Sequence, residues 1–549
     1  MMFRDFAELC EKVKSTSKKT EKVALVAAFL KNLSDEELKA ATTFLTGRVF
    51  PRGDPRDVNV GYSTIYKALL EVSGITPYEF QSIYLKYGDL GATAEEILST
   101  KKPKLQQLFK KQLTILDVKN ELEKLASITG KGSYDLKSAI IKGLFLDASP
   151  IEAKYIVKIL TSELRIGLVE GLVEEAIASA FGLSLDKVRS KLLILNDISE
   201  VALLAKKGLL EQATLTPLRP ISFMLADTAQ SPAEIADYFR RQVYAEFKFD
   251  GIRSQIHKLG NKVRIFSRRL EDVTESFPDI VEAVKRLKHD LVLDGEILPF
   301  KDGKPLPFQL LQRRLHRKYL SREVLEEAPL VFFAYDLLYL DGKPLLDLDL
   351  RSRREFLEKV EMEEPLSTSE IYTVTSAKEI QELFDRSKQI GFEGLVVKDP
   401  LSQYTPGRRG KHWIKLKKEL DTLDVVIVAA EYGHGKRAGI LSDYIFAVND
   451  NGVLKVIGKA YSGLTDDEML ELSEKLKSLM IEDLGYRVIV KPEIVLEVAF
   501  DSIQVSDRHD SGFALRFPRI KRIRFDKSVA EIDTLDKVKE IYMRQKVKL

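Results

Sequence analysis

The hydrophobic pattern of this chain changes its period near residue 213, and that change limits what the chain can fold into. Before it, apolar residues recur at helical spacing, for example in the stripe from Val169 to Ile177. Two prolines, Pro217 and Pro220, then interrupt the helical pattern. Strand-like runs dominate after them. We therefore predict an all-α domain over residues 1–212, followed by strand-rich domains.

The strand-rich part divides into two predicted domains. Strands mixed with helices are expected over residues 213–421, and this pattern is typical of an α/β domain. The strand-like runs there are 243–247, 263–267, 291–297 and 330–336. Over residues 422–549, short strands recur with glycine-containing turns around one helix at about 466–480, which predicts a small β-barrel.

Composition excludes several classes of protein. The single cysteine, Cys10, rules out an internal disulfide and a cysteine-rich zinc site, and it suits a reducing interior. The net charge is only +3, so any nucleic-acid surface must come from local clusters of Lys and Arg. The apolar run 23–30 is too short to span a membrane. We expect a soluble, intracellular (cytoplasmic) protein that does not enter membranes.

The segment Lys-Phe-Asp-Gly-Ile-Arg that begins at Lys248 concentrates chemical groups in six residues. Glu246, Lys248 and Asp250 share strand parity, so their side chains should project from one face. Gly251 permits a sharp turn or a close backbone approach to a ligand. Arg253 supplies a fixed fork of donors that suits phosphate or carboxylate.

Taken alone, this segment has two interpretations. It is either a charged hairpin on the surface or a lysine nucleophile that attacks a nucleotide phosphate. Lysine forms covalent intermediates when it loses its proton near neutral pH, and nearby cations favour that loss. Lys415 and Lys417, which share one face of an alternating run, are candidates for those cations.

Two other segments place carboxylates beside glycines. In Asp294-Gly295-Glu296 the two carboxylates share a face if the backbone is extended, so they could bind a ribose hydroxyl or a metal-bound water. A turn with salt-bridge partners is the alternative. Glu393 stands between Gly391 and Gly394 before an apolar run, either as a divalent-metal ligand or in a capped turn.

Basic and aromatic segments complete the candidate set. The basic runs 267–269, 408–417 and 515–527 could bind phosphate, pyrophosphate or nucleic acid, although each is also compatible with a solvated charged surface. Phe333 and Tyr335 alternate on an apolar strand, so one of them could stack on a base while core packing explains the other.

In their order, these segments resemble the motif set of covalent nucleotidyltransferases. The motifs are Lys-x-Asp-Gly-x-Arg at Lys248, Ser-Arg-Arg at Ser267, Asp-Gly-Glu at Asp294, the aromatic strand ending Tyr335-Asp336, Glu-Gly at Glu393, Lys-x-Lys at Lys415 and Arg-Phe-Pro-Arg at Arg516. The chain is most similar to ATP-dependent DNA ligases of the archaeal and eukaryotic replicative type. Residues 165–168 resemble part of that family's helical DNA-binding domain, and residues 220–226 resemble the start of its catalytic core.

The resemblance implies a fold and an activity. The fold is a helical DNA-binding domain (1–212), an α/β adenylation domain of ATP-grasp-like type (213–421) and a C-terminal OB-fold barrel (422–549). The activity is sealing of nicks in double-stranded DNA with ATP and Mg²⁺ or Mn²⁺, through a lysyl-AMP intermediate and an adenylated 5′-phosphate. The resemblance further implies a monomer at the nucleoid that serves DNA replication, repair and recombination, and whose domains close on a nick through hinges near Thr214 and Leu420.

The resemblance also implies a role for each candidate residue. Lys248 would be the AMP acceptor, and the other residues would contact the nucleotide, the metal or pyrophosphate. Those roles are adenine-edge recognition by Glu246, adenine stacking by Tyr335, ribose binding by Glu296, phosphate contacts by Arg253, Arg268, Arg409, Lys415 and Lys417, metal binding by Asp250 and Glu393, and pyrophosphate orientation by Arg519 and Lys527.

Some alternatives stay open. An mRNA-capping or RNA-joining enzyme would share the lysine motif, and a nucleic-acid-binding scaffold that has lost catalysis is a third hypothesis. ADP, GTP or NAD use in place of ATP is not decided by these residues. In related ligases a glutamine with two adjacent aromatics binds the sliding clamp. Here the corresponding region around Leu108 and Phe109 keeps one aromatic, which favours an ordinary amphipathic helix.

Overall fold

A computed structural model describes residues 1–547 except 53, 55, 101–110, 307, 313, 315–324, 326, 327, 418–420, 434–436 and 438. It separates into two compact units, one of Met1–Gly303, Phe308–Ile380 and Val396–Lys415, the other of Lys304–Pro307, Gln381–Leu395 and Leu416–Leu549. The predicted sliding-clamp region and the predicted hinge at Leu420 lie outside the described residues. The predicted domain boundaries at residues 212 and 421 stay predictions.

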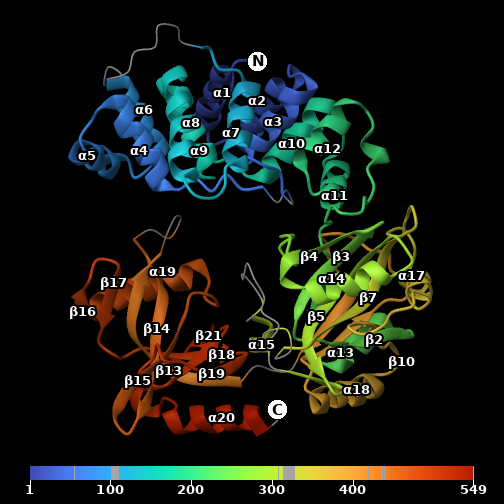
Figure 1. Cartoon of the computed structure of the whole chain (residues 1–549). Coiled ribbons are helices and arrows are strands. Elements are labelled where there is room, and N and C mark those ends of the chain that lie inside the picture. The colour runs from blue at the N-terminus through green and yellow to red at the C-terminus, as the bar shows by residue number, and fades with distance from the viewer. Residues whose placement is uncertain are drawn as a thin grey trace. The chain divides into compact units, whose positions relative to one another are not determined.

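The all-α prediction for the N-terminal region is confirmed (Figure 1). The helices are α1 (Phe3–Ser15), α2 (Lys19–Lys31), α3 (Asp35–Leu45), α4 (Tyr62–Ser73), α5 (Pro77–Tyr87), α6 (Leu90–Thr100), α7 (Ile115–Ser127), α8 (Ser133–Asp147), α9 (Pro150–Leu160), α10 (Glu170–Phe181), α11 (Leu185–Leu195) and α12 (Ile198–Lys206). They bury one continuous core that includes Phe6 and Phe44, whose ring centres lie 6.0 Å apart. The stripe on α10 is buried except for Val169, which precedes the helix and is 66% exposed.

The central region is a mixed α/β domain built on two sheets. One has five strands in the order β1-β12-β11-β2-β10; the other has seven, with the path β4-β3-β5-β7-β8, β6 beside β5 and β9 beside β7. The strands are β1 (Leu225–Ala229), β2 (Val243–Lys248), β3 (Ile252–Leu259), β4 (Lys262–Ser267), β5 (Leu291–Lys301), β6 (Lys304–Pro305), β7 (Leu330–Leu340), β8 (Lys343–Pro344), β9 (Leu366–Thr368), β10 (Tyr372–Val374), β11 (Gly394–Lys398) and β12 (Arg409–Lys417). All four predicted strands of this region are therefore confirmed.

The central region also contains helices. A second cluster of apolar side chains packs on the seven-stranded sheet. The helices are α13 (Pro232–Phe239), α14 (Pro278–Arg286), α15 (Phe308–Gln312), α17 (Leu350–Leu357) and α18 (Ala377–Ile390). Ile256, Leu293 and Phe332, from three neighbouring strands, are fully buried in the cluster. β-branched and large apolar residues such as these favour strands and pack on the covered face of a sheet.

The C-terminal region is rich in strands, as predicted, and forms a half-barrel. A seven-stranded sheet has the path β15-β14-β13-β17-β16, with β18 beside β13 and β21 beside β18, and β19 pairs with β20. The elements are β13 (Asp421–Tyr432), β14 (Leu441–Asp450), β15 (Val453–Ala460), α19 (Asp466–Ser478), β16 (Met480–Asp483), β17 (Arg487–Val490), β18 (Val495–Phe500), β19 (Ser502–Val505), β20 (Phe513–Arg516), β21 (Arg519–Ile523) and α20 (Leu535–Val547). The expectation of a single helix is wrong, because α20 packs on the same core through Leu535, Val538 and Ile541.

No helix among the residues described above is long and apolar enough to cross a membrane.

The chain between α12 and β1 is attached to β3 by buried polar side chains. The backbone N–H of Leu218 donates to His257 Nδ1 at 3.2 Å, and Gln255 forms hydrogen bonds with both backbone groups of Ile221 at 3.1 and 2.8 Å. His257 and Gln255 are fully buried, so the ring of His257 must stay neutral to accept this bond. The proline-containing segment is thus held as part of the central domain.

This arrangement predicts a pH dependence of stability. Burial, with a further contribution from Arg264, lowers the pKa of His257 to about 3 from the usual 6.5. Between these values the unfolded chain binds a proton that the folded chain does not, so His257 makes the free energy of unfolding fall by about 1.4 kcal/mol per pH unit as pH decreases from 6.5. His257→Gln should reduce that slope in urea unfolding between pH 4 and 6.5, followed by Trp413 fluorescence.

The matched control for this measurement is His509→Gln, in the loop between β19 and β20, which should keep the original slope. Equal slopes for His257→Gln and the unchanged protein would contradict the assignment of a neutral buried histidine.

Candidate active site

Lys248 is the last residue of β2 and is half-buried. Glu246, two residues earlier on the same face of the strand, is 2% exposed. Because β2 ends at Lys248, Asp250 lies beyond the strand, and the parity argument places only Glu246 and Lys248 on one face. The sequence prediction of a strand that presents these two side chains together is therefore confirmed for two of its three residues.

Gly251 is required by a close backbone approach within the chain. A Cβ atom at this position would lie 2.3 Å from the carbonyl oxygen of Ile297 on β5. Real Cβ atoms do not approach backbone atoms so closely, so any larger residue would push the start of β3 away from β5. The sequence predicted a sharp turn or a close backbone approach to a ligand at Gly251, and the structure shows a close approach to the neighbouring strand β5.

Arg253 and Asp294 form a bidentate ion pair in the interior of the seven-stranded sheet. Nε and Nη2 of Arg253 donate to the two carboxylate oxygens at 3.1 and 2.7 Å, and Nη1 donates to the backbone oxygen of Met224 at 2.7 Å. Asp294 is fully buried and also accepts a 2.8 Å hydrogen bond from the hydroxyl of Tyr404. Burial opposes the charge of Arg253, but Asp294 raises the pKa of Arg253 well above its ordinary value.

A second buried ion pair joins β2 to β11. Lys398 Nζ donates to Glu246 Oε1 at 2.8 Å, and both side chains are at most 3% exposed. The other carboxylate oxygen of Glu246 accepts from the hydroxyl of Ser369 at 3.0 Å. Burial lowers the pKa of Lys398, and the adjacent Glu246 acts in the opposite direction. The predicted adenine-edge residue is thus held from two sides by the protein.

Two aromatic rings lie between these ion pairs. Lys398 Nζ is 4.5 Å from the ring centre of Tyr335 and 4.4 Å from that of Trp413, and the guanidinium of Arg253 is 5.6 and 5.8 Å from the same centres. A β-bulge leaves Tyr335 as the extra residue of β7, because Gly295 pairs with Ala334 and Asp294 pairs with Asp336. Bulges of this kind re-aim the side chain of the extra residue, here Tyr335.

Phe333 has a different environment from Tyr335. Its ring stacks on that of Phe249 with centres 4.7 Å apart, and it meets Phe300 edge-on at 5.2 Å. Strand register places Phe333 opposite Glu296, which in turn stands opposite Arg253. These three residues therefore share one face of the sheet, and Glu296, the predicted ribose ligand, is half-buried on it.

The predicted phosphate-binding cations lie on β12 and in the turn after β4. Arg268 and Arg409 are exposed, Lys415 is half-buried and Lys417 is exposed. Ile414 and Leu416 are 5% and 2% exposed, so the predicted alternation along this strand is confirmed.

Glu393 precedes β11 and pairs with Lys417, with 3.1 Å between Oε2 and Nζ. Among the described residues no group of three or more His, Cys, Asp or Glu side chains could hold a metal ion. Mg²⁺ is commonly bound by one or two carboxylates plus water and substrate phosphate oxygens, and the carboxylates of Asp250 and Glu393 supply the oxygen ligands it prefers. The predicted metal ligands are therefore compatible with Mg²⁺ in their chemistry.

The predicted pyrophosphate-orienting residues lie in the C-terminal region. Arg519 is the first residue of β21 and is exposed. Lys527 Nζ donates to Asp424 at 2.7 Å, which raises the pKa of Lys527, and Arg524 donates to the other oxygen of the same carboxylate at 2.9 Å. Asp424 thus holds two cations of the basic segment side by side.

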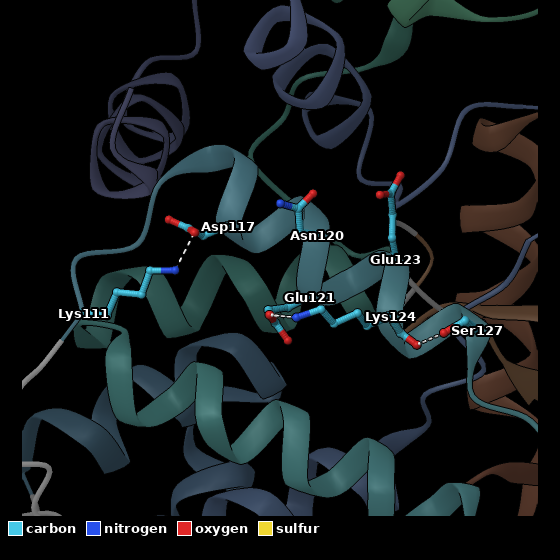
Figure 2. Close-up of a pocket in the computed structure, with 7 residues that line it drawn as sticks. All are labelled: Lys111, Asp117, Asn120, Glu121, Glu123, Lys124 and Ser127. Atoms are coloured by element: carbon cyan, nitrogen blue, oxygen red, sulfur yellow. Dashed lines mark hydrogen bonds and ion pairs between the residues drawn. The ribbon is translucent and has the colours of Figure 1, made fainter.

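A hollow of about 560 Å³ lies elsewhere, along α7 in the helical region (Figure 2). Its charged groups are already paired, Lys111 with Asp117 and Lys124 with Glu121, each at 2.6 Å. Figure 2 shows these side chains directed toward each other along the helix surface, so this hollow offers no set of converging polar groups for a ligand.

Sequence reasoning missed three residues that organise the site. Lys398 carried a signal, since it is a lone lysine at the end of an apolar run. Ser369 and Tyr404 carried none, because each acts only through a strand distant in the sequence. For the segment of Asp294 the sequence left a ligand-binding carboxylate and a salt-bridged carboxylate open, and the two oxygens of Asp294 bind Arg253 and Tyr404.

The site has a lysine at the end of β2 and a buried carboxylate two residues before it. Lys398 joins that carboxylate to two aromatic rings, and this arrangement fits the class of covalent nucleotidyltransferases. Comparison with known proteins is more specific. Family models described as DNA ligase N terminus, ATP dependent DNA ligase domain and ATP dependent DNA ligase C terminal region match residues 2–178, 223–417 and 437–527.

Similar proteins agree with these matches. The chain is 42% identical to a probable DNA ligase of Koribacter versatilis (98% of this chain, 96% of that one) and 40% identical to a DNA ligase of Archaeoglobus fulgidus (99% of each). The solved structure Pmar-Lig_PreS3 has the same fold, with a TM-score of 0.56 at 19% identity over 94% of this chain and 99% of that one. The chain belongs to the family of ATP-dependent DNA ligases, enzymes that form phosphodiester bonds.

The buried pair predicts that removing Arg253 is costly. Arg253→Ala leaves the fully buried carboxylate of Asp294 without its cation, and we expect a loss of about 3–5 kcal/mol in the free energy of unfolding. Urea unfolding followed by fluorescence is well suited, because Trp413 is the chain's one tryptophan and its ring lies 5.8 Å from the guanidinium.

Arg264→Ala is the matched control, since Arg264 is 41% exposed and 3.6 Å from Asp272 on the surface. It should cost no more than about 1 kcal/mol. Similar losses for the two variants would show that the buried pair contributes no more to the free energy of unfolding than a surface ion pair does.

Proposed function

We propose that this ligase seals nicks in double-stranded DNA with Lys248 as the AMP acceptor. The observation that carries the proposal is the position of Lys248 at the end of β2, two residues after a carboxylate that Lys398 holds beside the ring of Tyr335. A nucleotide base placed against Tyr335 and Glu246 would direct its phosphates toward the end of the strand. The order of the basic and acidic motifs along the chain supports the same site.

The chemistry has three steps. The deprotonated Nζ of Lys248 attacks the α-phosphate of ATP, a phosphorus–nitrogen bond forms, and the α–β phosphoanhydride bond breaks to release pyrophosphate. An oxygen of the 5′-phosphate at the nick then takes the AMP from the lysine. The 3′-hydroxyl finally attacks that 5′-phosphate, loses its proton and displaces AMP. Negative charge develops on a phosphate in every step, so cations must surround it.

The remaining candidates have roles consistent with this sequence of steps. Tyr335 stacks on adenine, Glu246 accepts from its amino group and Glu296 binds the ribose. The other roles are contacts with nucleotide and nick phosphates by Arg268, Arg409, Lys415 and Lys417, and pyrophosphate orientation by Arg519 and Lys527. Arg253 uses three of its five N–H donors on Asp294 and Met224, and contact with a phosphate would use the N–H groups of Nη1 and Nη2 that these bonds leave over.

Mg²⁺ or Mn²⁺ is the cofactor we propose, with Asp250 and Glu393 as its protein ligands. When bound, the ion supplies positive charge to the phosphate oxygens. We further propose a monomer that acts in DNA replication, repair and recombination at the nucleoid, with nicked duplex DNA bound partly by the helical region. Binding to a sliding clamp around Leu108 and Phe109 stays a prediction.

The covalent step can be tested with ATP labelled at its α-phosphate. We expect the label to remain on the protein in a denaturing gel, and to be lost completely in Lys248→Ala because the acceptor nitrogen is gone. Lys262→Ala, at the exposed start of β4, should keep the label. Lys248→Ala should still join a nick whose 5′-phosphate already carries AMP, which shows that the variant is folded.

Other outcomes would redirect or reject the proposal. Absence of label on the unchanged protein with either metal would reject it. Label from GTP alone would favour an mRNA-capping activity, and sealing of nicked RNA in preference to nicked DNA would favour RNA joining.

A further inference from the structure

Lys398 is a buried cation that the three chemical steps do not use. It ends the apolar strand β11, its side chain is 2% exposed, and its ammonium contacts Glu246, Tyr335 and Trp413 together. A charge is buried in this way only where it is paired, because transfer from water is costly. Here the pairing connects the residue proposed to read the adenine edge with the ring proposed to stack on the base.

The hydrogen bonds around Glu246 fix its chemical state. Ser369 accepts from Arg354 through both its hydroxyl oxygen (3.2 Å) and its backbone oxygen (2.7 Å). With its hydroxyl oxygen accepting from arginine, Ser369 directs its own proton to Glu246 Oε2. Glu246 thus receives one donor on each oxygen, from Ser369 and from Lys398, so both oxygens act as acceptors.

An acceptor-only carboxylate discriminates between purines by their 6-position. The 6-amino group of adenine donates and therefore satisfies it. The 6-oxo group of hypoxanthine or guanine accepts, so it would place oxygen against oxygen in a buried site. Sites that leave buried polar groups unpaired with the wrong substrate discriminate strongly.

We propose that Lys398 is a positioning residue that makes the nucleotide site specific for 6-amino purines, by holding Glu246 as a fixed acceptor beside the ring of Tyr335. This inference rests on the proposed function, because it assumes that the nucleotide lies against Glu246 and Tyr335. Lys398 itself need not touch the nucleotide.

The test compares ATP with inosine triphosphate, which has the same sugar and triphosphate and differs at the purine 6-position. The measured quantity is the ratio of the rates of covalent protein labelling from the two nucleotides, each labelled at its α-phosphate. Lys398→Met keeps the length and apolar stem of the side chain but removes the charge. We expect the ATP preference to fall by roughly tenfold or more, since one oxygen of Glu246 loses the donor that holds it as an acceptor.

Lys258→Met is the matched control. Lys258 is 5% exposed on β3 and its charged partner is Asp290, 3.9 Å away. This variant should keep the ATP preference of the unchanged protein. A purely structural role for buried lysines would change labelling from both nucleotides by the same factor and leave the ratio unaltered.

A second variant covers the case in which Lys398→Met does not fold. Glu246→Gln combined with Lys398→Met removes both charges of the pair at similar volume, a change that buried ion pairs often tolerate. The glutamine amide can accept from a 6-amino group or donate to a 6-oxo group, so the ATP preference should again fall. Circular dichroism verifies the fold of both variants.

An ATP preference that stays unchanged in a folded variant would overturn the role of Lys398. That failure differs from failure of the proposed function, in which the unchanged protein would take no label from ATP at all.

Discussion

The bidentate ion pair between Arg253 and Asp294 is the interaction on which the rest of the site depends. It joins β3 to β5 inside the seven-stranded sheet, takes the backbone oxygen of Met224 as a third partner and fixes the hydroxyl of Tyr404. Breaking such a pair leaves an uncompensated charge in the interior, whereas an apolar pair of the same size could serve for stability alone. The ion pair therefore serves to fix the position of the Arg253 guanidinium, which also faces the rings of Tyr335 and Trp413.

The second buried pair, Lys398 with Glu246, approaches the same two rings. One pair belongs to the seven-stranded sheet and the other to the five-stranded sheet. Cations from the two sheets thus meet the same aromatic rings, which ties the sheets together through directional contacts in addition to apolar packing. A ring held by two cations has little freedom to turn.

The sequence predicted the secondary structure of this region well because its strands alternate or are wholly apolar. It also placed Glu246, Lys248, Glu296 and Tyr335 on strands, and the structure has them on β2, β5 and β7. It could not predict which carboxylate serves the fold and which serves a ligand. Asp294 and Glu296 lie two residues apart on β5, and strand register places Glu296 opposite Arg253, yet Asp294 is the carboxylate that forms the bidentate ion pair with Arg253. The roles of Tyr404 and Ser369 could not be predicted either, because contacts between segments far apart in the sequence leave no local sequence pattern. The helix α20 was missed although Leu535, Val538 and Ile541, which it buries, recur every three residues in the sequence.

Two glycines of the sequence motifs, Gly251 and Gly295, are required by the packing of the sheet. A Cβ on Gly295 would lie 2.3 Å from the ring of Phe332 and 2.5 Å from the carbonyl oxygen of Phe333, and one on Gly251 would meet β5 as closely. Both glycines therefore keep β3, β5 and β7 at the separation that lets Arg253 reach Asp294. The place of Gly251 in the segment 248–253 is imposed by this sheet contact. An enzyme that lost the reaction but kept the fold would retain Gly251, Arg253, Asp294 and Gly295. The presence of these four residues in the motifs is accordingly explained by the packing of the sheet.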